Sequence, residues 1–134
     1  MEQSELTNFI SCEIKDIKRG NLSNQPGVYI LYRKGHTSQR YLNKDTTGLI
    51  YIGSSSNLQQ RINSLKNGIL RNNPQIHSIN KRLNSYFTDS QDIGYYLIKY
   101  QYLKSVEESK DKEKELIEKY FKKYLDLPIL NSKR

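Results

Sequence analysis

The sequence predicts an α+β fold in which a small antiparallel sheet of three strands is flanked by helices. Two segments rich in β-branched and aromatic residues, 27–33 and 48–53, follow one another with no helical segment between them. That order argues against a doubly wound parallel sheet, in which helices alternate with strands. The surrounding segments place apolar residues at helical intervals. With 134 residues, we predict a single domain over residues 1–134.

The first half of the chain supplies the start of this fold. Apolar residues in 4–18 recur at helical spacing and Gly20 offers a stop, so we predict an N-terminal helix that extends the domain over residues 1–20. The two strands follow, joined by residues 34–47, a segment that is polar and long for a hairpin loop. We expect this insertion to carry contacts to a substrate.

Capping residues mark the helices of the second half. Three consecutive serines, 54–56, and Asn57 offer N-caps for a helix that reaches about residue 70, and Asn73 with Pro74 opens a second helix to residue 87. Residues 93–102 have the composition of the third strand. Ser105 and Glu108 form a capping box, which predicts a last helix ending near residue 125.

Composition and charge restrict the functions that the chain can have. Its 22 Lys and Arg residues against 14 Asp and Glu residues leave a net charge of +8, which favours a polyanionic partner. No apolar run approaches the ~20 residues of a membrane span, and the first residues lack the basic lead of a secretory signal, so we expect a cytoplasmic protein with no membrane partner. One Cys and two His cannot form a four-ligand zinc site.

One ordered set of residues resembles the GIY-YIG nuclease family. Gly27-Val28-Tyr29 begins one strand segment, Tyr51-Ile52-Gly53 ends the next, and Arg61 follows Tyr51 by ten residues. The match continues through His77, an acidic residue in the last helix, and Asn131. It covers residues 26–131, which we take as the core of the domain.

The resemblance implies a Mg²⁺-dependent or Mn²⁺-dependent DNA endonuclease that hydrolyses a phosphodiester by attack of water. In that family one of the two tyrosines acts as a general base or positions the water, and the sequence leaves open whether Tyr29 or Tyr51 does so. Gly27, Gly53 and Asn131 stand as structural motif residues. The alternative is a non-catalytic DNA-binding module that retains the nuclease fold.

Strand and helix geometry give these residues separate tasks. Because side chains alternate along a strand, Tyr29 shares a face with Leu31 and Tyr51 shares a face with Gly53, so pairing of the strands can bring the tyrosines together. Arg61, near the start of its helix, can donate to two phosphate oxygens. We expect His77 to act as an acid, a base or a phosphate donor.

The metal-binding carboxylate is predicted from the last helix. Glu113 precedes Ile117 by four residues and so falls on the apolar face, where a carboxylate is costly unless it binds a cation. Glu118 lies at the edge of that face and is the alternative. Glu115 points nearly opposite, and we expect both Glu115 and Glu118 to pair with lysines four residues later. One carboxylate with waters suits Mg²⁺.

Basic residues outside the motif can follow a DNA backbone, so we expect DNA to be bound mostly through its phosphates. The short chain leaves little room for a separate recognition region. We therefore expect that the protein reads little sequence, that it acts with a specificity partner or as a transient dimer, or that it acts on a DNA structure such as a flap, nick or branch. The predicted DNA-binding residues are Arg33, Lys34, Arg40, Lys44, Lys66, Lys81 and Arg82.

Overall fold

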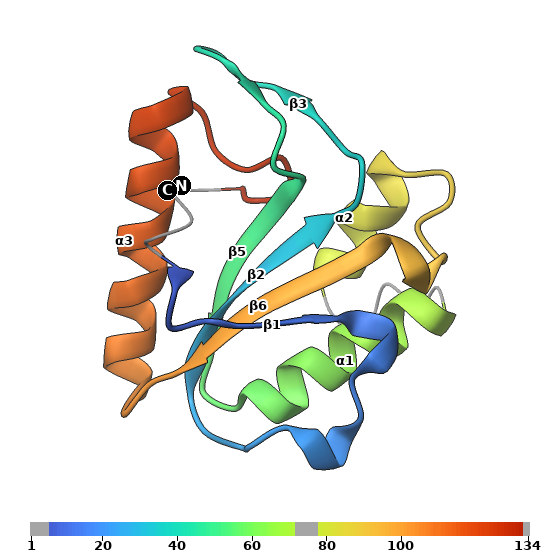
Figure 1. Cartoon of the computed structure of the whole chain (residues 1–134), viewed down its shortest axis with the longest axis vertical. Helices are drawn as coiled ribbons and strands as arrows, with labels where there is room; N and C mark the ends of the chain where they lie inside the picture. The colour runs from blue at the N-terminus through green and yellow to red at the C-terminus, as the bar shows by residue number, and fades with distance from the viewer. Residues whose placement is uncertain (1–5, 72–77, 133–134) are drawn as a thin grey trace.

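A computed structural model of the chain describes residues 6–71 and 78–132 (Figure 1). The described residues form an antiparallel four-stranded sheet in the order β1-β6-β2-β5. Its strands are β1 (Ile10–Glu13), β2 (Gly27–Arg33), β5 (Leu49–Ser55) and β6 (Tyr96–Tyr102). The helices are α1 (Leu58–Arg71), α2 (Ser78–Tyr86) and α3 (Val106–Tyr124). The predicted α+β class is confirmed.

Helices cover both faces of the sheet, and alternation along β2 decides what each face buries. Tyr29 and Leu31 lie in one apolar cluster with residues of α1 and α2, including Ile62. Val28 and Ile30 lie in a second cluster with residues of α3. All four β2 side chains are fully buried, so β2 is the centre of the core. None of the described helices combines the length and the apolar character that crossing a bilayer requires.

The predicted N-terminal helix is wrong, and a fourth strand takes its place. β1 pairs with β6 in the register Ile10↔Tyr100, and two short 3-10 helices, η2 (Ile14–Asp16) and η3 (Arg19–Asn21), follow. Without β1, the outer backbone groups of β6 would be left as an unpaired sheet edge. This pairing between distant segments overrides the helical periodicity, and Ile14 still reaches the core.

The predicted caps of the later helices are confirmed. The Asn57 Oδ1 accepts a hydrogen bond from the Gln60 backbone N at 3.0 Å, at the start of α1. The Ser105 Oγ accepts from the Glu108 backbone N at 3.0 Å, at the start of α3. Asn73 and Pro74, the predicted start of the middle helix, lie outside the described residues. The local capping chemistry therefore places α1 and α3 as the sequence indicates.

The long insertion between β2 and β5 contains a two-stranded ribbon, formed by β3 (Ser38–Gln39) and β4 (Lys44–Asp45). Asp45 fixes this ribbon to the end of α3. Its side chain is 1% exposed, and it accepts hydrogen bonds from the Tyr120 hydroxyl at 2.6 Å and from the Thr47 backbone N at 2.9 Å. The insertion is therefore an integral part of the fold, because Asp45 anchors it through a buried hydrogen-bond network.

We predict that Asp45→Ala lowers the free energy of unfolding by about 2 kcal/mol or more, because the buried Tyr120 hydroxyl and the Thr47 groups lose their acceptor. Urea denaturation followed by circular dichroism measures this. Thr46→Ala, at an exposed neighbouring position, should change the free energy by less than ~0.5 kcal/mol. Equal stability of the two variants would show that Asp45 does not anchor the ribbon.

Candidate active site

The two motif tyrosines lie on the same face of the sheet, as the sequence predicts. In the pairing of β2 with β5, Tyr29 lies opposite Gly53 and Leu31 lies opposite Tyr51. The rings of Tyr29 and Tyr51 are 6.0 Å apart between centroids. Tyr29 is fully buried, and its hydroxyl has no hydrogen-bond partner among the described residues. Tyr51 is half-buried and therefore accessible to a ligand.

Gly53 is required by the close approach of both rings. A Cβ atom at this position would lie 2.8 Å from the Tyr29 hydroxyl and 2.7 Å from the Tyr51 Cε2. Gly27 is required for a different reason, because a Cβ there would clash with the Gln101 carbonyl oxygen and with the Leu58 side chain. Gly53 thus leaves room for the two tyrosine rings, and Gly27 allows β2 to pack against β6 and α1.

Arg61 lies in the first turn of α1, where its backbone N donates to the Asn57 carbonyl at 3.0 Å. Burial raises the pKa of both Tyr29 and Tyr51 above the ordinary phenol value. The Glu113 carboxylate raises the pKa of Tyr51 further, and the positive charge of Arg61 acts in the opposite direction on both phenols. Both tyrosines are neutral near pH 7, so each hydroxyl can donate and accept hydrogen bonds.

A pocket of about 170 Å³ lies at the outer edge of β5. β5 is the last strand of the sheet, so residues from both of its faces reach this edge. The carboxylate of Glu113 faces the pocket from α3, and its Oε1 accepts a hydrogen bond from the Ser54 hydroxyl at 2.8 Å. The lining residues are Tyr51, Ile52, Arg82, Glu113, Ile117, Asn131 and Ser132.

Asn131 closes the outer edge of β5 beside the pocket. Its Nδ2 donates to the Ile52 carbonyl at 2.9 Å, and its Oδ1 accepts from the Ile52 backbone N at 3.0 Å. The Leu130 backbone N adds a hydrogen bond to the Ile50 carbonyl at 3.0 Å. The side-chain amide thus substitutes for a neighbouring strand, which satisfies the edge and holds the C-terminal segment against the site.

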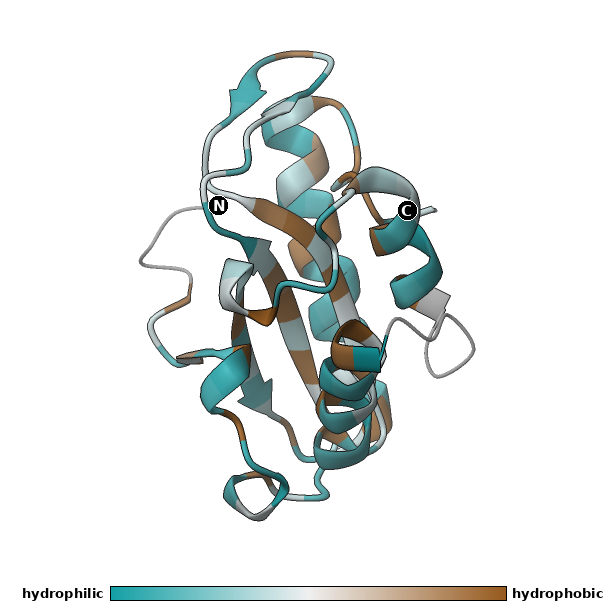
Figure 2. Cartoon of the chain, turned by 90° about the vertical axis from the view of Figure 1, so that its right-hand side faces the viewer, coloured by the Kyte–Doolittle hydropathy of each residue, from teal (hydrophilic) through white to brown (hydrophobic). Residues whose placement is uncertain are grey.

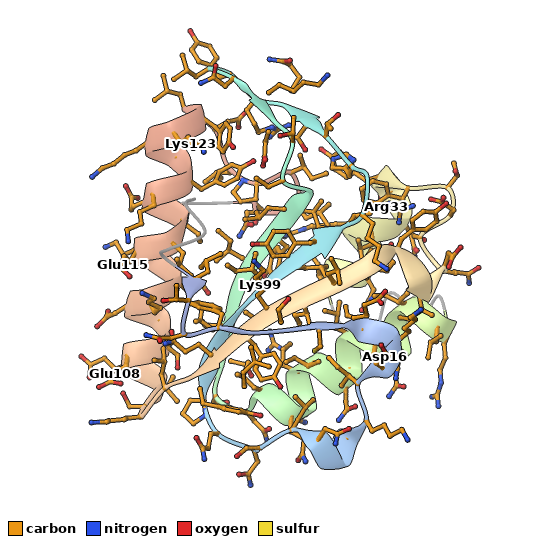
Figure 3. All side chains as sticks on the ribbon, in the orientation of Figure 1. Asp16, Arg33, Lys99, Glu108, Glu115 and Lys123 are labelled. Carbon is orange, nitrogen blue, oxygen red and sulfur yellow. The ribbon has the colours of Figure 1, made fainter. Side chains whose placement is uncertain are left out.

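The carboxylates of α3 divide as the helix periodicity indicates. Glu115 is exposed on the outer face of α3 (Figure 3), where it pairs with Lys112 at 2.8 Å and with Lys119 at 4.0 Å. Glu118 is half-buried and does not line the pocket. The described residues contain no cluster of three or more His, Cys, Asp or Glu side chains that could hold a metal ion. A cation in this pocket would therefore have Glu113 as its carboxylate ligand.

Two of the predicted DNA-binding residues have structural roles instead. Arg33 is 5% exposed, donates to the Tyr96 hydroxyl at 2.8 Å, pairs with Asp89 and stacks 4.1 Å over the Phe87 ring. Lys66 donates to backbone carbonyls of the N-terminal segment. Aromatic neighbours from β6 and the segment after α2 enclose the Arg33 guanidinium, so this side chain is not exposed to a phosphate group in this structure.

The other predicted basic residues differ in their freedom to contact DNA. Lys34 pairs with Glu13, and Arg40 donates to the Leu127 carbonyl at 2.9 Å, so both have partners within the protein. Lys44 and Lys81 are exposed. His77 lies outside the described residues.

Arg82 has a more specific position than the sequence indicates. Its guanidinium donates to the Leu130 carbonyl at 2.7 Å and to the Ser132 hydroxyl at 3.1 Å, and it lines the pocket opposite α3. Ser54, which orients Glu113, is not among the predicted site residues. Neither role has a local sequence pattern, because each depends on how α2, α3 and the C-terminal segment meet at β5.

Comparisons with known proteins gave two similar solved structures. No protein-family model and no curated protein matches the sequence. The chain is similar to the GIY-YIG N-terminal endonuclease domain of UvrC from Thermotoga maritima bound to magnesium, its catalytic divalent cation, with 22% identity, a TM-score of 0.48 and coverage of 98% of this chain and 100% of that chain. It is also similar to a point mutant of that domain bound to its catalytic divalent cation. For this structure the identity is 21% and the TM-score is 0.49, and the match covers 99% of this chain and 100% of that chain. Both of these solved structures are GIY-YIG endonuclease domains.

We predict that Gly53→Ala destabilises the protein by about 1–3 kcal/mol, because the new methyl group must displace the Tyr29 or Tyr51 ring. Thermal denaturation and near-ultraviolet circular dichroism of the tyrosines report both effects. Gly20→Ala is the matched control, since nothing lies within 4 Å of a Cβ at that position. An unchanged tyrosine spectrum in Gly53→Ala would contradict the packing described for the two rings.

Proposed function

We propose that the chain is a Mg²⁺-dependent or Mn²⁺-dependent DNA endonuclease that hydrolyses a phosphodiester by attack of water at the β5 pocket. The observation that carries this proposal is the meeting of Tyr51, Arg82 and Glu113 at one pocket. They come from three segments far apart in the chain, and a phenol, a guanidinium and a carboxylate together supply the groups that hydrolysis of a phosphodiester needs.

Glu113 fits the requirements of a Mg²⁺ ligand. Its carboxylate is half-buried at the pocket, and the hydrogen bond from the Ser54 hydroxyl orients it. Hydrogen bonds of this kind fix the direction of carboxylates that bind metals. Protein sites for Mg²⁺ use one or two carboxylates and leave the remaining positions to waters and substrate phosphates. When bound, the cation polarises the phosphoryl oxygen and stabilises the leaving oxygen.

Tyr51 is the tyrosine that we assign to the attacking water. It lines the pocket, whereas Tyr29 is fully buried beside it. Because the pKa of Tyr51 is raised, its hydroxyl is a neutral phenol that accepts a hydrogen bond from the water and holds it in line with the phosphorus. Tyr29 supports the Tyr51 ring from the neighbouring strand.

Two guanidinium groups stabilise the negative charge of the phosphate. Arg82 enters the pocket from α2, held by the Leu130 carbonyl and the Ser132 hydroxyl. Arg61 lies beside the tyrosines at the start of α1, where its charge acts on both phenols. Guanidinium groups fixed before the reaction stabilise the extra charge of the transition state without reorganisation. The exposed Lys44 and Lys81 supply phosphate contacts outside the pocket.

The alternative, a DNA-binding module without catalysis, does not account for Glu113. A carboxylate at a phosphate-binding pocket repels DNA unless a cation lies between them. A binding module would gain affinity from its removal and would need no hydroxyl from Ser54 to orient it. Removal of the Glu113 charge therefore distinguishes the two functions: a nuclease would lose its cleavage activity, whereas a binding module would only gain affinity for DNA.

We predict that Glu113→Gln reduces the rate of plasmid nicking in Mg²⁺ by about 100-fold or more, because the neutral amide keeps the shape of the side chain but binds the cation weakly. Its affinity for DNA in EDTA, measured by gel shift, should equal or exceed that of the wild type, since a negative charge is removed. Glu115→Gln, on the outer face, should nick at the wild-type rate.

Controls separate the possible failures. EDTA should abolish nicking by the wild type, and Mn²⁺ should restore it. Loss of nicking in Glu118→Gln, with nicking retained in Glu113→Gln, would show that Glu118 and not Glu113 is the cation ligand. If the wild type binds DNA but nicks none of plasmid, duplex and branched DNA in either cation, the protein is a DNA-binding module and the proposed activity is refuted.

A further inference from the structure

We infer that the tip of the β3–β4 ribbon, Tyr41 and Leu42, is a wedge that stacks on an unpaired base about five base pairs from the cut. The substrate that this protein prefers is then duplex DNA with an unpaired nucleotide at that distance. This inference rests on the proposed nuclease function and deepens it, because it names the class of DNA.

The wedge residues are exposed although they are apolar. The Tyr41 side chain is 81% exposed and Leu42 is 53% exposed, so Tyr41 is the most exposed of the large hydrophobic residues that the structure describes. Figure 2 shows the ribbon at one end of the molecule, with a hydrophobic segment at its tip. Adjacent exposed aromatic and aliphatic side chains indicate a surface that a binding partner covers.

The backbone under the wedge is held in place. The Leu42 backbone N donates to the Tyr124 carbonyl at 2.9 Å, and the Arg40 backbone N donates to the Asn43 carbonyl at 3.0 Å. The Arg40 side chain donates to the Leu127 carbonyl, and Asp45 is buried against α3. A wedge supported in this way loses little conformational freedom when it binds, which favours insertion between bases.

The net charge of +8 and the exposed Lys44 of the ribbon favour nucleic acid as the partner. Within residues 38–47, the exposed charged residue is Lys44, whereas the carboxylate of Asp45 is 1% exposed. The exposed charge on the ribbon itself is therefore positive, and the carboxylate of Asp126 beside it pairs with Arg40 at 3.5 Å. An aromatic ring stacks on any unpaired base, and apolar side chains of this kind open base steps in proteins that bend DNA.

The distance from the pocket follows from α3. Leu42 contacts the last residue of that helix, Tyr124, and Glu113 lies eleven residues earlier on the same helix. At about 1.5 Å per residue the separation along the helix axis is about 16 Å. A base step rises about 3.4 Å, so on a duplex that runs parallel to α3 the tip would lie about five base pairs from Glu113. The C-terminal segment also joins the two places, because Arg40 contacts Leu127 and Asn131 lines the pocket.

The test compares cleavage of two duplexes in Mg²⁺, one fully paired and one with a single unpaired 2-aminopurine. The wild type should cut the second about five base pairs from the unpaired base and at least about 10-fold faster than the first. Tyr41→Ala should cut both duplexes at the rate of the paired one, while Tyr41→Phe keeps the preference. Tyr86→Ala, at another exposed tyrosine, should behave as the wild type.

Fluorescence of the 2-aminopurine in EDTA reports stacking without cleavage. Addition of the wild type should quench it, and Tyr41→Ala should not. Cleavage without a preference, a preference retained by Tyr41→Ala, or equal quenching by the two proteins would overturn the wedge and leave the nuclease function intact. Absence of cleavage on both duplexes and on plasmid would refute the nuclease function, and the wedge with it.

Discussion

The contact of Tyr29 with Gly53 across β2 and β5 is the constraint on which the rest of the site depends. It requires a residue without a Cβ opposite the buried ring, and it sets the register that places Tyr51 two residues away on the same face. The same pairing leaves β5 as the last strand of the sheet. A shift of β5 by one residue against β2 would move Tyr51 to the face of α3, away from Tyr29, which the pairing of β2 with β6 holds in place.

The outer edge of β5 explains how residues from both faces of a sheet meet. Tyr51 comes from the face of α1, and Ser54 reaches Glu113 on the face of α3. An exposed edge would invite pairing with another chain, but the amide of Asn131 satisfies the backbone of Ile52. Asn131 therefore satisfies the Ile52 backbone at this edge and still leaves space for the pocket beside it.

Strand alternation and helix periodicity correctly predicted those features that depend on neighbouring residues in the sequence. Alternation along the strands placed the tyrosines together, and the periodicity of the last helix placed Glu113 inward and Glu115 outward. The predictions failed where distant segments decide the outcome. The N-terminal segment became β1 because β6 offered an edge, and Arg33 was enclosed by rings that lie more than fifty residues later. The position of Arg82 likewise depends on the docking of α2 and the C-terminal segment.

The position of the cation tests the account most directly. Substoichiometric Mn²⁺ broadens the amide NMR signals nearest to its binding site. We expect the strongest broadening at residues 51–54 and at Glu113, and we expect Glu113→Gln to abolish it. Broadening centred on Glu108, Asp111 and Glu115, which line a separate hollow on α3, or broadening that persists in Glu113→Gln, would contradict the account.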